Sequence, residues 1–484
     1  MSPGARPRPE RPELSVLMVT LNAWDWTQRA LAALVEHTEP CFEVIVADNA
    51  STDGTLAGLE RLERLGELTL LRNPVNRGFG PAVNQAALLA RAPHLLLLNT
   101  DALVRPGWLS PLRAVLDAEP EVAAVAPRLL HLDGSVQEAG SIVWGDGEVW
   151  PYGADQPADR YEYRFRRDVD YASAACMLLR RSAFVDVGGF DPVYAPAYYE
   201  DVDLCLALWE RGLRVVCQPS SEVTHAGGAS TDRARIGTLL QRNRPVFERR
   251  WGRVLAARPA APVHWEPRDV IPGRDLRCDE RILVVGDFVP DTRQPRLRDL
   301  VLGLARLWPR ARITCLALDP DGAESSAPPL LAAGVEIAIP GDDLDAWLSD
   351  RRHHYGVVLA TSYAAVMPPV RGGLATAQPR AHRVLLLDEA FDHDAGDATY
   401  RAGVESAHLL LCRDGAQRER AAEIAPRAAL AVVEAAPGGS MDAALVAALA
   451  AVALAPPAGQ DPQSRVSPAG REIVAAASGA ARLR

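Results

Sequence analysis

The sequence predicts an α/β protein with two Rossmann-like domains, and three observations support this. At 484 residues the chain is too long for one ordinary hydrophobic core. Short apolar runs alternate with segments of helical spacing, which indicates right-handed βαβ units on a largely parallel sheet. This alternation occurs twice, on either side of a Pro-rich stretch at 256–279 that we interpret as a linker. We therefore expect one domain at 13–255 and a second at 280–440.

The first domain begins with four strands, each a short apolar run that ends in polar residues. The strands are predicted at 14–21, 42–48, 68–73 and 94–99, and helices at 23–37, 55–65 and 84–91. A basic, aromatic segment at 241–252 is expected to be the closing helix.

The second domain shows six short apolar runs between residues 281 and 414, separated by helical or loop stretches. This pattern predicts a doubly wound sheet. Outside the domains, residues 1–12 are expected to be a disordered tail, and 441–484 an Ala-rich helix followed by a disordered tail.

Composition excludes several classes of protein. The formal net charge of −10 argues against a nucleic-acid binder. The sequence contains no lysine, which excludes a Walker A phosphate loop and a Schiff-base lysine. The seven cysteines are scattered without a CxxC pair, and the longest apolar stretch, 443–455, is shorter than the roughly 20 residues of a membrane span. We expect a cytoplasmic protein, at most peripheral to the inner face of the plasma membrane.

Polar residues gather after each of the first four strands. Turn chemistry alone could explain each group, but together they would line one edge of the sheet, where α/β proteins bind ligands. Asp48 could accept the imide N–H of a pyrimidine base, and Asp101 could offer a carboxylate oxygen to a hard cation. The candidate ligand-binding residues at this edge, which the resemblance described below assigns to a nucleotide-sugar, are Thr20, Asn22, Asp48, Asn49, Ser51, Arg77, Gly78, Asn84, Asn99, Thr100 and Asp101.

A second acidic group, Glu200, Asp201 and Asp203, opens an apolar helical run after Tyr198 and Tyr199. Acid at a helix start is ordinary, because it complements the helix dipole. A carboxylate beside aromatic rings could also be a general base whose proton affinity is raised by burial.

Five motifs decide between these interpretations. "VTLNAWDWT", "VIVADNASTDGT", "NRGFGPAVNQA", "LLLLNTDALVRPGWL" and "GGFDPVYAPAYYEDVDLCLALWERG" together resemble a family 2 glycosyltransferase of the bacterial rhamnosyltransferase-like branch. The resemblance covers about residues 14–250 and implies a GT-A fold with a mixed sheet. It implies that Asp48 reads the base, that Asp101 of the Asn99–Asp101 motif holds a metal with His225, and that Asp201 is the catalytic base. Glu200 and Asp203 would orient the acceptor or hold the local loop.

The resemblance also implies the reaction: inverting, metal-dependent transfer from a nucleotide-diphospho-sugar, with Mn²⁺ or Mg²⁺ as cofactor. Thymidine-diphosphate rhamnose is the favoured donor, and a cell-envelope glycan or lipid-linked molecule the acceptor. Two alternatives remain, a non-catalytic nucleotide-sugar-binding scaffold and a sugar-nucleotidyltransferase. The second domain resembles the N-terminal half of a GT-B glycosyltransferase, and we interpret it as a module without catalytic residues.

Overall fold

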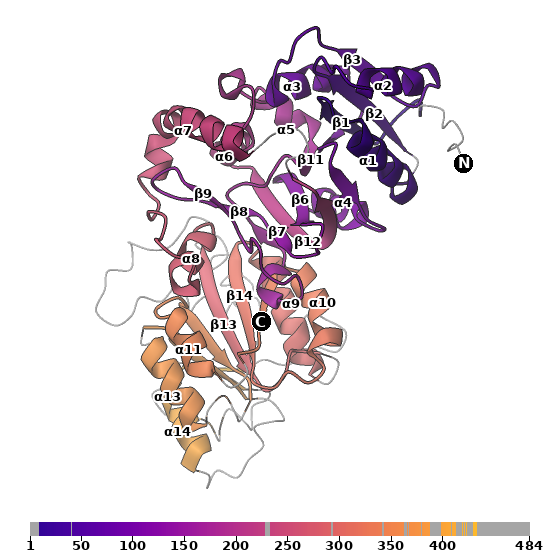
Figure 1. The fold of residues 1–484 in the computed structure, drawn as a ribbon. Coiled ribbons are helices and arrows are strands. Elements are labelled where there is room, and N and C mark those ends of the chain that lie inside the picture. The colour runs from indigo at the N-terminus through magenta and orange to yellow at the C-terminus, as the bar shows by residue number, and fades with distance from the viewer. Residues whose placement is uncertain are drawn as a thin grey trace. The chain divides into compact units, whose positions relative to one another are not determined.

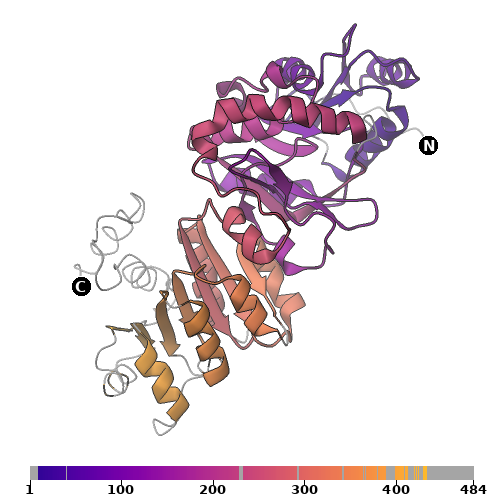
Figure 2. The same ribbon diagram turned by 60° about the vertical axis from the view of Figure 1, so that its left-hand side comes forward.

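The fold is described by a computed structural model, in which contacts divide the chain into two compact units between Val263 and His264 (Figures 1 and 2). Each unit contains one large sheet. The structure describes residues 9–39, 41–227, 233–291, 294–340, 343–362, 365, 367–378, 380–387, 398–407, 409–412, 419, 421, 423 and 429–432.

The sheet of the first unit is mixed, as expected. Strands β1 to β4 run parallel, whereas β11 is antiparallel to both of its neighbours, β4 and β6. Two short strands, β5 (Ala102–Val104) and β7 (Val136–Glu138), pair with β12 and β6. The strand order is β10 (Arg167–Asp168), β12 (Arg214–His225), β6 (Val122–Leu130), β11 (Cys176–Arg180), β4 (His94–Leu98), β1 (Leu14–Thr20), β2 (Phe42–Asp48) and β3 (Thr69–Arg72).

Helices cover both faces of this sheet, because alternate strand residues point to opposite sides. Val16 and Met18 pack in one core cluster with α1 (Trp24–His37), α2 (Thr55–Arg64) and α4 (Leu109–Ala118). Leu17, between them, packs in the other cluster with α3 (Phe79–Leu89), α5 (Arg181–Asp186) and α6 (Glu200–Glu210). The long helix α7 (Arg233–Leu255), prominent in Figure 2, packs Phe247 and Trp251 against α6.

Smaller elements complete the first unit. A separate two-stranded ribbon lies outside the main sheet, and two short 3₁₀ turns interrupt the loops around it. These elements are β8 (Ser141–Val143), β9 (Val149–Pro151), η1 (Tyr161–Tyr163) and η2 (Pro192–Tyr194).

The second unit is a doubly wound parallel sheet, as the sequence predicts. The strand order is β15 (Val335–Ala338), β14 (Ala311–Ala317), β13 (Glu280–Gly286), β16 (Val357–Ala360), β17 (His382–Leu387), β18 (Leu409–Cys412) and β19 (Ala429–Val432). The helices between these strands lie on both sides of the sheet (Figure 1). They are α9 (Pro295–Leu307), α10 (Ala323–Ala332), α11 (Leu344–Asp350), α13 (Pro368–Ala377) and α14 (Ala398–Ser406).

Four elements differ from the sequence prediction. Helix α3 begins at Phe79, five residues before the expected start at Asn84, because the preceding glycine supplies the turn into the helix. Helix α7 extends well beyond 241–252 in both directions. A seventh strand, β19, was missed because its sequence is Ala-rich, and alanine is depleted in strands. Of the tails predicted at 1–12 and 441–484, the structure describes only residues 9–12, where the backbone oxygens of Pro9 and Glu10 accept hydrogen bonds from Arg91.

The expected linker at 256–279 contains a helix, α8 (Pro267–Arg274). It ends in a buried ion network, in which Arg274 pairs with Asp275 at 2.6 Å and with Glu336 of β15 at 2.8 Å. Asp275 also accepts a hydrogen bond from Arg312 of β14. These contacts make α8 part of the second unit, and the pattern of prolines alone did not reveal this.

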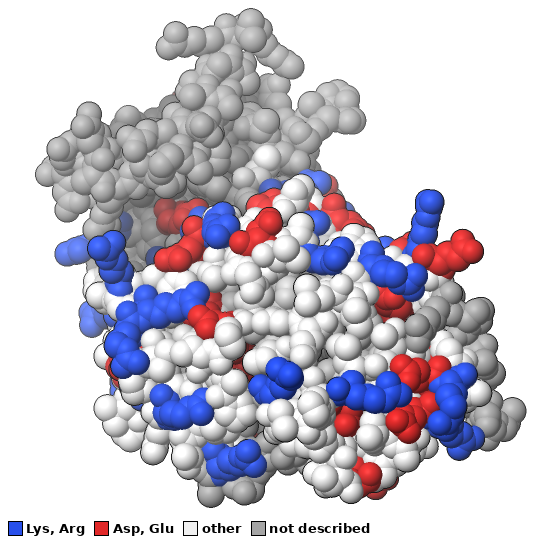
Figure 3. Space-filling view, turned by 90° about the horizontal axis from the view of Figure 1, so that it is seen from above, with Lys and Arg blue, Asp and Glu red and all other residues white. Residues whose placement is uncertain are grey.

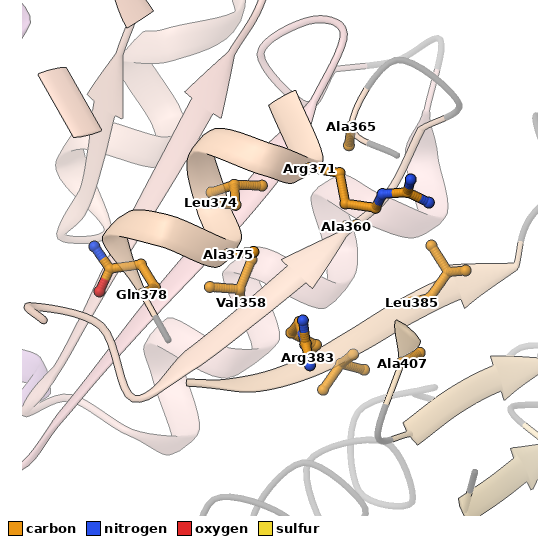
Figure 4. Close-up of a pocket in the computed structure, with 11 residues that line it drawn as sticks. Val358, Ala360, Ala365, Arg371, Leu374, Ala375, Gln378, Arg383, Leu385 and Ala407 are labelled. Carbon is orange, nitrogen blue, oxygen red and sulfur yellow. The ribbon is translucent and has the colours of Figure 1, made fainter. Parts of the chain in front are cut away.

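The second unit also contains a small pocket between α13 and strands β16 and β17 (Figure 4). Arg371 and Arg383 line it together with mostly apolar side chains. Its cavity volume is about 50 Å³, and none of the predicted site residues lines it.

Two surface properties bear on partners. Arginines and carboxylates are interspersed on the face shown in Figure 3, without a large patch of one sign. Among the described residues, we find no helix with the length and apolar character needed to cross a bilayer.

Candidate active site

Asp48 ends β2 and is buried at the predicted nucleotide edge. Its Oδ2 accepts a hydrogen bond from the backbone N–H of Ser51 at 3.1 Å. Its Oδ1 is buried and has no hydrogen-bond partner among the described residues. A buried carboxylate oxygen without a donor is unfavourable, so this atom suits a ligand that brings an N–H group.

The first two strand ends are held together by short hydrogen bonds. Asn22, with φ of +51°, accepts at Oδ1 from Thr52 N at 2.6 Å, and its own N–H donates to Ser51 Oγ at 2.9 Å. Thr20 shares a hydroxyl–hydroxyl hydrogen bond of 3.2 Å with Thr27. These predicted binding residues therefore form one rim beside Asp48.

The third strand end meets the loop that precedes α6. Asn49 donates from Nδ2 to Gly78 O at 3.1 Å, and the next residue, Phe79, donates its backbone N–H to Pro196 O at 2.7 Å. Gly78 adopts φ of +90°, and a Cβ there would lie 2.7 Å from Pro196 Cα. Only glycine permits this close approach of the two loops.

Two other predicted residues in this region have different surroundings. Arg77 is exposed beside Gly78. Asn84 uses both ends of its amide on one residue: it donates to Phe190 O at 2.7 Å and accepts from Phe190 N at 2.9 Å. In this structure Asn84 therefore fixes the position of the chain before α6. Its contact with a nucleotide-sugar stays a prediction.

The fourth strand end brings Asn99, Thr100 and Asp101 to His225, the last residue of β12. His225 Nε2 lies 3.2 Å from Asp101 Oδ1 and 3.4 Å from Asn99 Nδ2. On its other side, His225 Nδ1 lies 2.7 Å from Gln137 Oε1. The predicted metal pair, Asp101 and His225, is thus brought together from β5 and β12, which are adjacent antiparallel strands.

The chemistry of this pair fits a divalent cation. A carboxylate oxygen is an ordinary ligand of Mg²⁺ and Mn²⁺, whereas an imidazole nitrogen binds transition-metal ions more readily than Mg²⁺. Among the described residues no cluster of three or more His, Cys, Asp or Glu side chains forms a metal site. Two protein ligands are nevertheless enough for an ion that is also bound by substrate phosphates and water.

Asp201 and Asn99, which lies two residues before Asp101, contact the same short stretch before β11. Ala175 O accepts the backbone N–H of Asn99 at 2.9 Å, and Ala174 N donates to Asp201 Oδ2 at 3.3 Å. Burial raises the pKa of Tyr198, and the carboxylates of Asp201 and Asp101 raise it further. The charges of both carboxylates therefore act on the phenol of Tyr198, as expected if Asp101 and Asp201 share a site.

Two further carboxylates are buried beside Asp201. Burial, together with the charge of Asp201, raises the pKa of Glu200 well above its usual range, and Glu200 Oε2 has no partner among the described residues. Burial also raises the pKa of Glu138 to about 7, although its Oε1 accepts the backbone N–H of Ser173 at 3.0 Å. Burial raises the pKa of Asp201 as well, which makes it a stronger base than an exposed aspartate.

Asp203 has a different environment. Its Oδ1 accepts hydrogen bonds from Trp251 Nε1 at 2.8 Å and from the Tyr194 hydroxyl at 3.1 Å. Arg250 Nε lies 3.1 Å from the same oxygen. The sequence left two roles open for Asp203: orienting the acceptor or holding the local structure. These contacts link α6 to α7 and so support the second role. They give no support to a contact with the acceptor.

Helix α7 also holds the loop that leads into Asp201. Asn243 is buried, and its Nδ2 donates to the carbonyl oxygens of Tyr194 at 2.8 Å, Ala197 at 3.0 Å and Tyr198 at 2.8 Å. Tyr198 and Tyr199 both have positive φ, at 78° and 74°. Such backbone costs about 1–3 kcal/mol per residue and persists only where its surroundings enforce it.

Sequence reasoning missed Gln137, Glu138 and Asn243. The first two lie on β7, a three-residue strand whose short apolar pattern gives little signal. Asn243 lies inside a helix, where a buried asparagine is unusual and could have been noticed.

Comparisons with known proteins identify the family of this chain. A family model described as glycosyl transferase family 2 matches residues 15–188. A curated relative, the N-acetylglucosaminyl-diphospho-decaprenol L-rhamnosyltransferase of Mycobacterium tuberculosis, is 34% identical over 256 residues, covering 48% of this chain and 82% of the relative. The O-antigen biosynthesis protein RfbC of Myxococcus xanthus is 36% identical over 233 residues, covering 45% of this chain and 18% of that protein.

A solved structure, GalNAc-T7 with UDP, GalNAc and Mn²⁺, superposes with a TM-score of 0.38 and 18% sequence identity, covering 45% of this chain and 44% of that one. The family model covers the four strand ends and stops before Asp201 and His225. The chain therefore belongs to glycosyl transferase family 2 and is a glycosyltransferase.

Proposed function

We propose that this protein transfers a sugar, with inversion, from a nucleotide-diphospho-sugar to a hydroxyl group of a cell-envelope glycan or lipid-linked acceptor. The observation that carries the proposal is the meeting of Asn99 and Asp201 on adjacent residues, Ala175 and Ala174. This meeting supports Asp201 as a general base close to the strand end that carries Asp101. The family membership favours this reaction over the nucleotidyltransferase and scaffold alternatives.

The transfer is a single displacement. The acceptor oxygen attacks the anomeric carbon, its proton passes to an Asp201 oxygen, and the bond from that carbon to the diphosphate oxygen breaks. Backbone N–H groups of Ala174 and Val202 contact the two Asp201 oxygens and fix the direction of the carboxylate. No covalent intermediate with the enzyme is needed.

The cation and the nucleotide would be bound at the other strand ends. Asp101 and His225 would hold a divalent cation, which supplies positive charge to the diphosphate leaving group. Asp48 Oδ1 would accept the N–H of a pyrimidine base. The name of the mycobacterial relative supports a rhamnose donor and a lipid-diphosphate acceptor, so we propose thymidine-diphosphate rhamnose as the donor.

The test is Asp201→Asn, which keeps the shape of the side chain but removes the base. We expect transfer and donor hydrolysis to fall by about two to four orders of magnitude, since general bases contribute 10²–10⁴-fold. Donor binding, measured by thermal shift with thymidine-diphosphate rhamnose and Mn²⁺, should remain. Asp186→Asn, at the exposed end of α5, is the charge-matched control.

Two results would overturn the proposal. Unchanged turnover of Asp201→Asn would remove the assigned base. A product with the same anomeric configuration as the donor, determined by NMR, would exclude a single displacement.

A further inference from the structure

We propose that Gln137 is a positioning residue: it fixes the tautomer of His225, so that the Nε2 lone pair faces Asp101 before a cation binds. This inference rests on the proposed metal-dependent function. It concerns a residue outside the sequence motifs, on the short strand β7.

The orientation of the Gln137 amide follows from its neighbours. Its Nε2 lies 3.4 Å from the backbone carbonyl oxygen of His225, which can only accept a hydrogen bond. The same Nε2 lies 3.3 Å from His131 Nδ1. Since the nitrogen end faces the carbonyl, the oxygen end, Oε1, faces His225 Nδ1 at 2.7 Å.

The amide orientation determines where the imidazole proton lies. Oε1 is an acceptor only, so a 2.7 Å contact requires a hydrogen on Nδ1. In neutral His225 the other nitrogen, Nε2, then carries the lone pair. That nitrogen lies 3.4 Å from Asn99 Nδ2, an amide group that can donate a hydrogen bond to it, and 3.2 Å from Asp101 Oδ1. A cation bound there would meet both the Nε2 lone pair and the carboxylate.

Gln137 can contact His225 because of the position of β7 in the sheet. Val136 and Glu138 pair with Leu130 and Leu129 of β6, and β12 pairs with the same end of β6. Side chains alternate along a strand, so Gln137 contacts His225 while Glu138 contacts the stretch before β11. One strand thereby supports both the proposed cation ligand and the stretch that holds Asp201.

The first experiment observes the tautomer directly. The full-length protein is labelled with ¹⁵N-histidine, and two-bond ¹H–¹⁵N spectra are recorded without metal, with His225→Ala to assign the resonance. We expect the Nδ1–H tautomer in wild type and a mixture of both tautomers in Gln137→Met, which keeps the length but removes the amide. A wild-type His225 in the Nε2–H tautomer would overturn the inference, whatever the metal does.

The second experiment measures Mn²⁺ affinity by the EPR signal of free Mn²⁺ in the presence of thymidine diphosphate. We expect Gln137→Met to bind Mn²⁺ about 10–100-fold more weakly, the usual effect of removing a partner of a metal-bound histidine. Gln137→Glu keeps an acceptor for Nδ1–H but lacks the N–H that faces the His225 carbonyl, so it should bind Mn²⁺ more tightly than Gln137→Met. Gln28→Met, on the exposed side of α1, should have no effect.

The outcomes separate the inference from the proposed function. If wild type binds Mn²⁺ and His225→Ala weakens binding while Gln137→Met does not, only the role of Gln137 is wrong. If wild type with thymidine diphosphate binds no Mn²⁺, the metal-dependent function is wrong, and the inference fails with it.

Discussion

Replacing Gly78 with alanine tests the contact between the chain after β3 and the loop 195–199, which precedes the proposed base Asp201. Gly78 has φ of 90° and ψ of 171°, a region occupied essentially by glycine alone. The new Cβ would lie 2.7 Å from Pro196 Cα and 2.8 Å from Pro196 O. Both are backbone atoms, so the contact cannot be relieved by rotating a side chain.

The expected cost has two parts. The backbone conformation costs an alanine about 1–3 kcal/mol, and overpacking adds about 1–3 kcal/mol. A total near 3 kcal/mol would lower the Tm of a unit of this size by about 6–12 °C. Displacing the 195–199 loop would also move Asp201, and a shift near 1 Å can lower kcat about 100-fold.

The matched control is Gly107→Ala. Gly107 also has positive φ, at +75°, but a Cβ there would meet no atom within 4 Å. Thermal unfolding of both variants separates backbone strain from the clash, and donor hydrolysis reports the catalytic loop. Equal Tm and equal kcat in the two variants would refute the claim that Gly78 sets the position of Pro196.

Two other predictions follow from buried polar groups. Asn243→Asp replaces the amide donor by a carboxylate that faces three carbonyl oxygens. We expect the free energy of unfolding, measured in urea, to fall by at least about 2 kcal/mol, and kcat to fall more than donor affinity changes. An unaffected kcat would exclude a positioning role for Asn243. Burial raises the pKa of Glu138 from 4.5 to about 7, so the folded protein retains a proton that the unfolded chain has lost, and stability falls as pH rises through this window. Glu138→Gln removes this titrating group. The free energy of unfolding of the variant, relative to that of wild type, should therefore rise by up to about 3 kcal/mol between pH 5 and pH 8. A difference that stays constant with pH would contradict the raised pKa of Glu138.

The sequence alone determined the sheet edges and the motifs that follow them. Strand β2 lies where it was predicted, and β1 and β4 end within a residue of their predicted ends, because buried parallel strands are nearly continuous apolar runs. Asp48 and Asp101 could be chosen as candidate residues for the same reason: a polar residue directly after such a run lies at the ligand-binding edge.

Only the tertiary structure decided which of these residues act together. Asp203 and Asp201 are two positions apart in the acidic group, yet Asp203 hydrogen-bonds to Trp251 of α7 and Asp201 to the chain before β11. Gln137 reaches His225, 88 residues away, only because β7 and β12 flank the same end of β6. Apolar periodicity records which face of an element is buried, and contacts between polar side chains on distant strands leave no such period in the sequence.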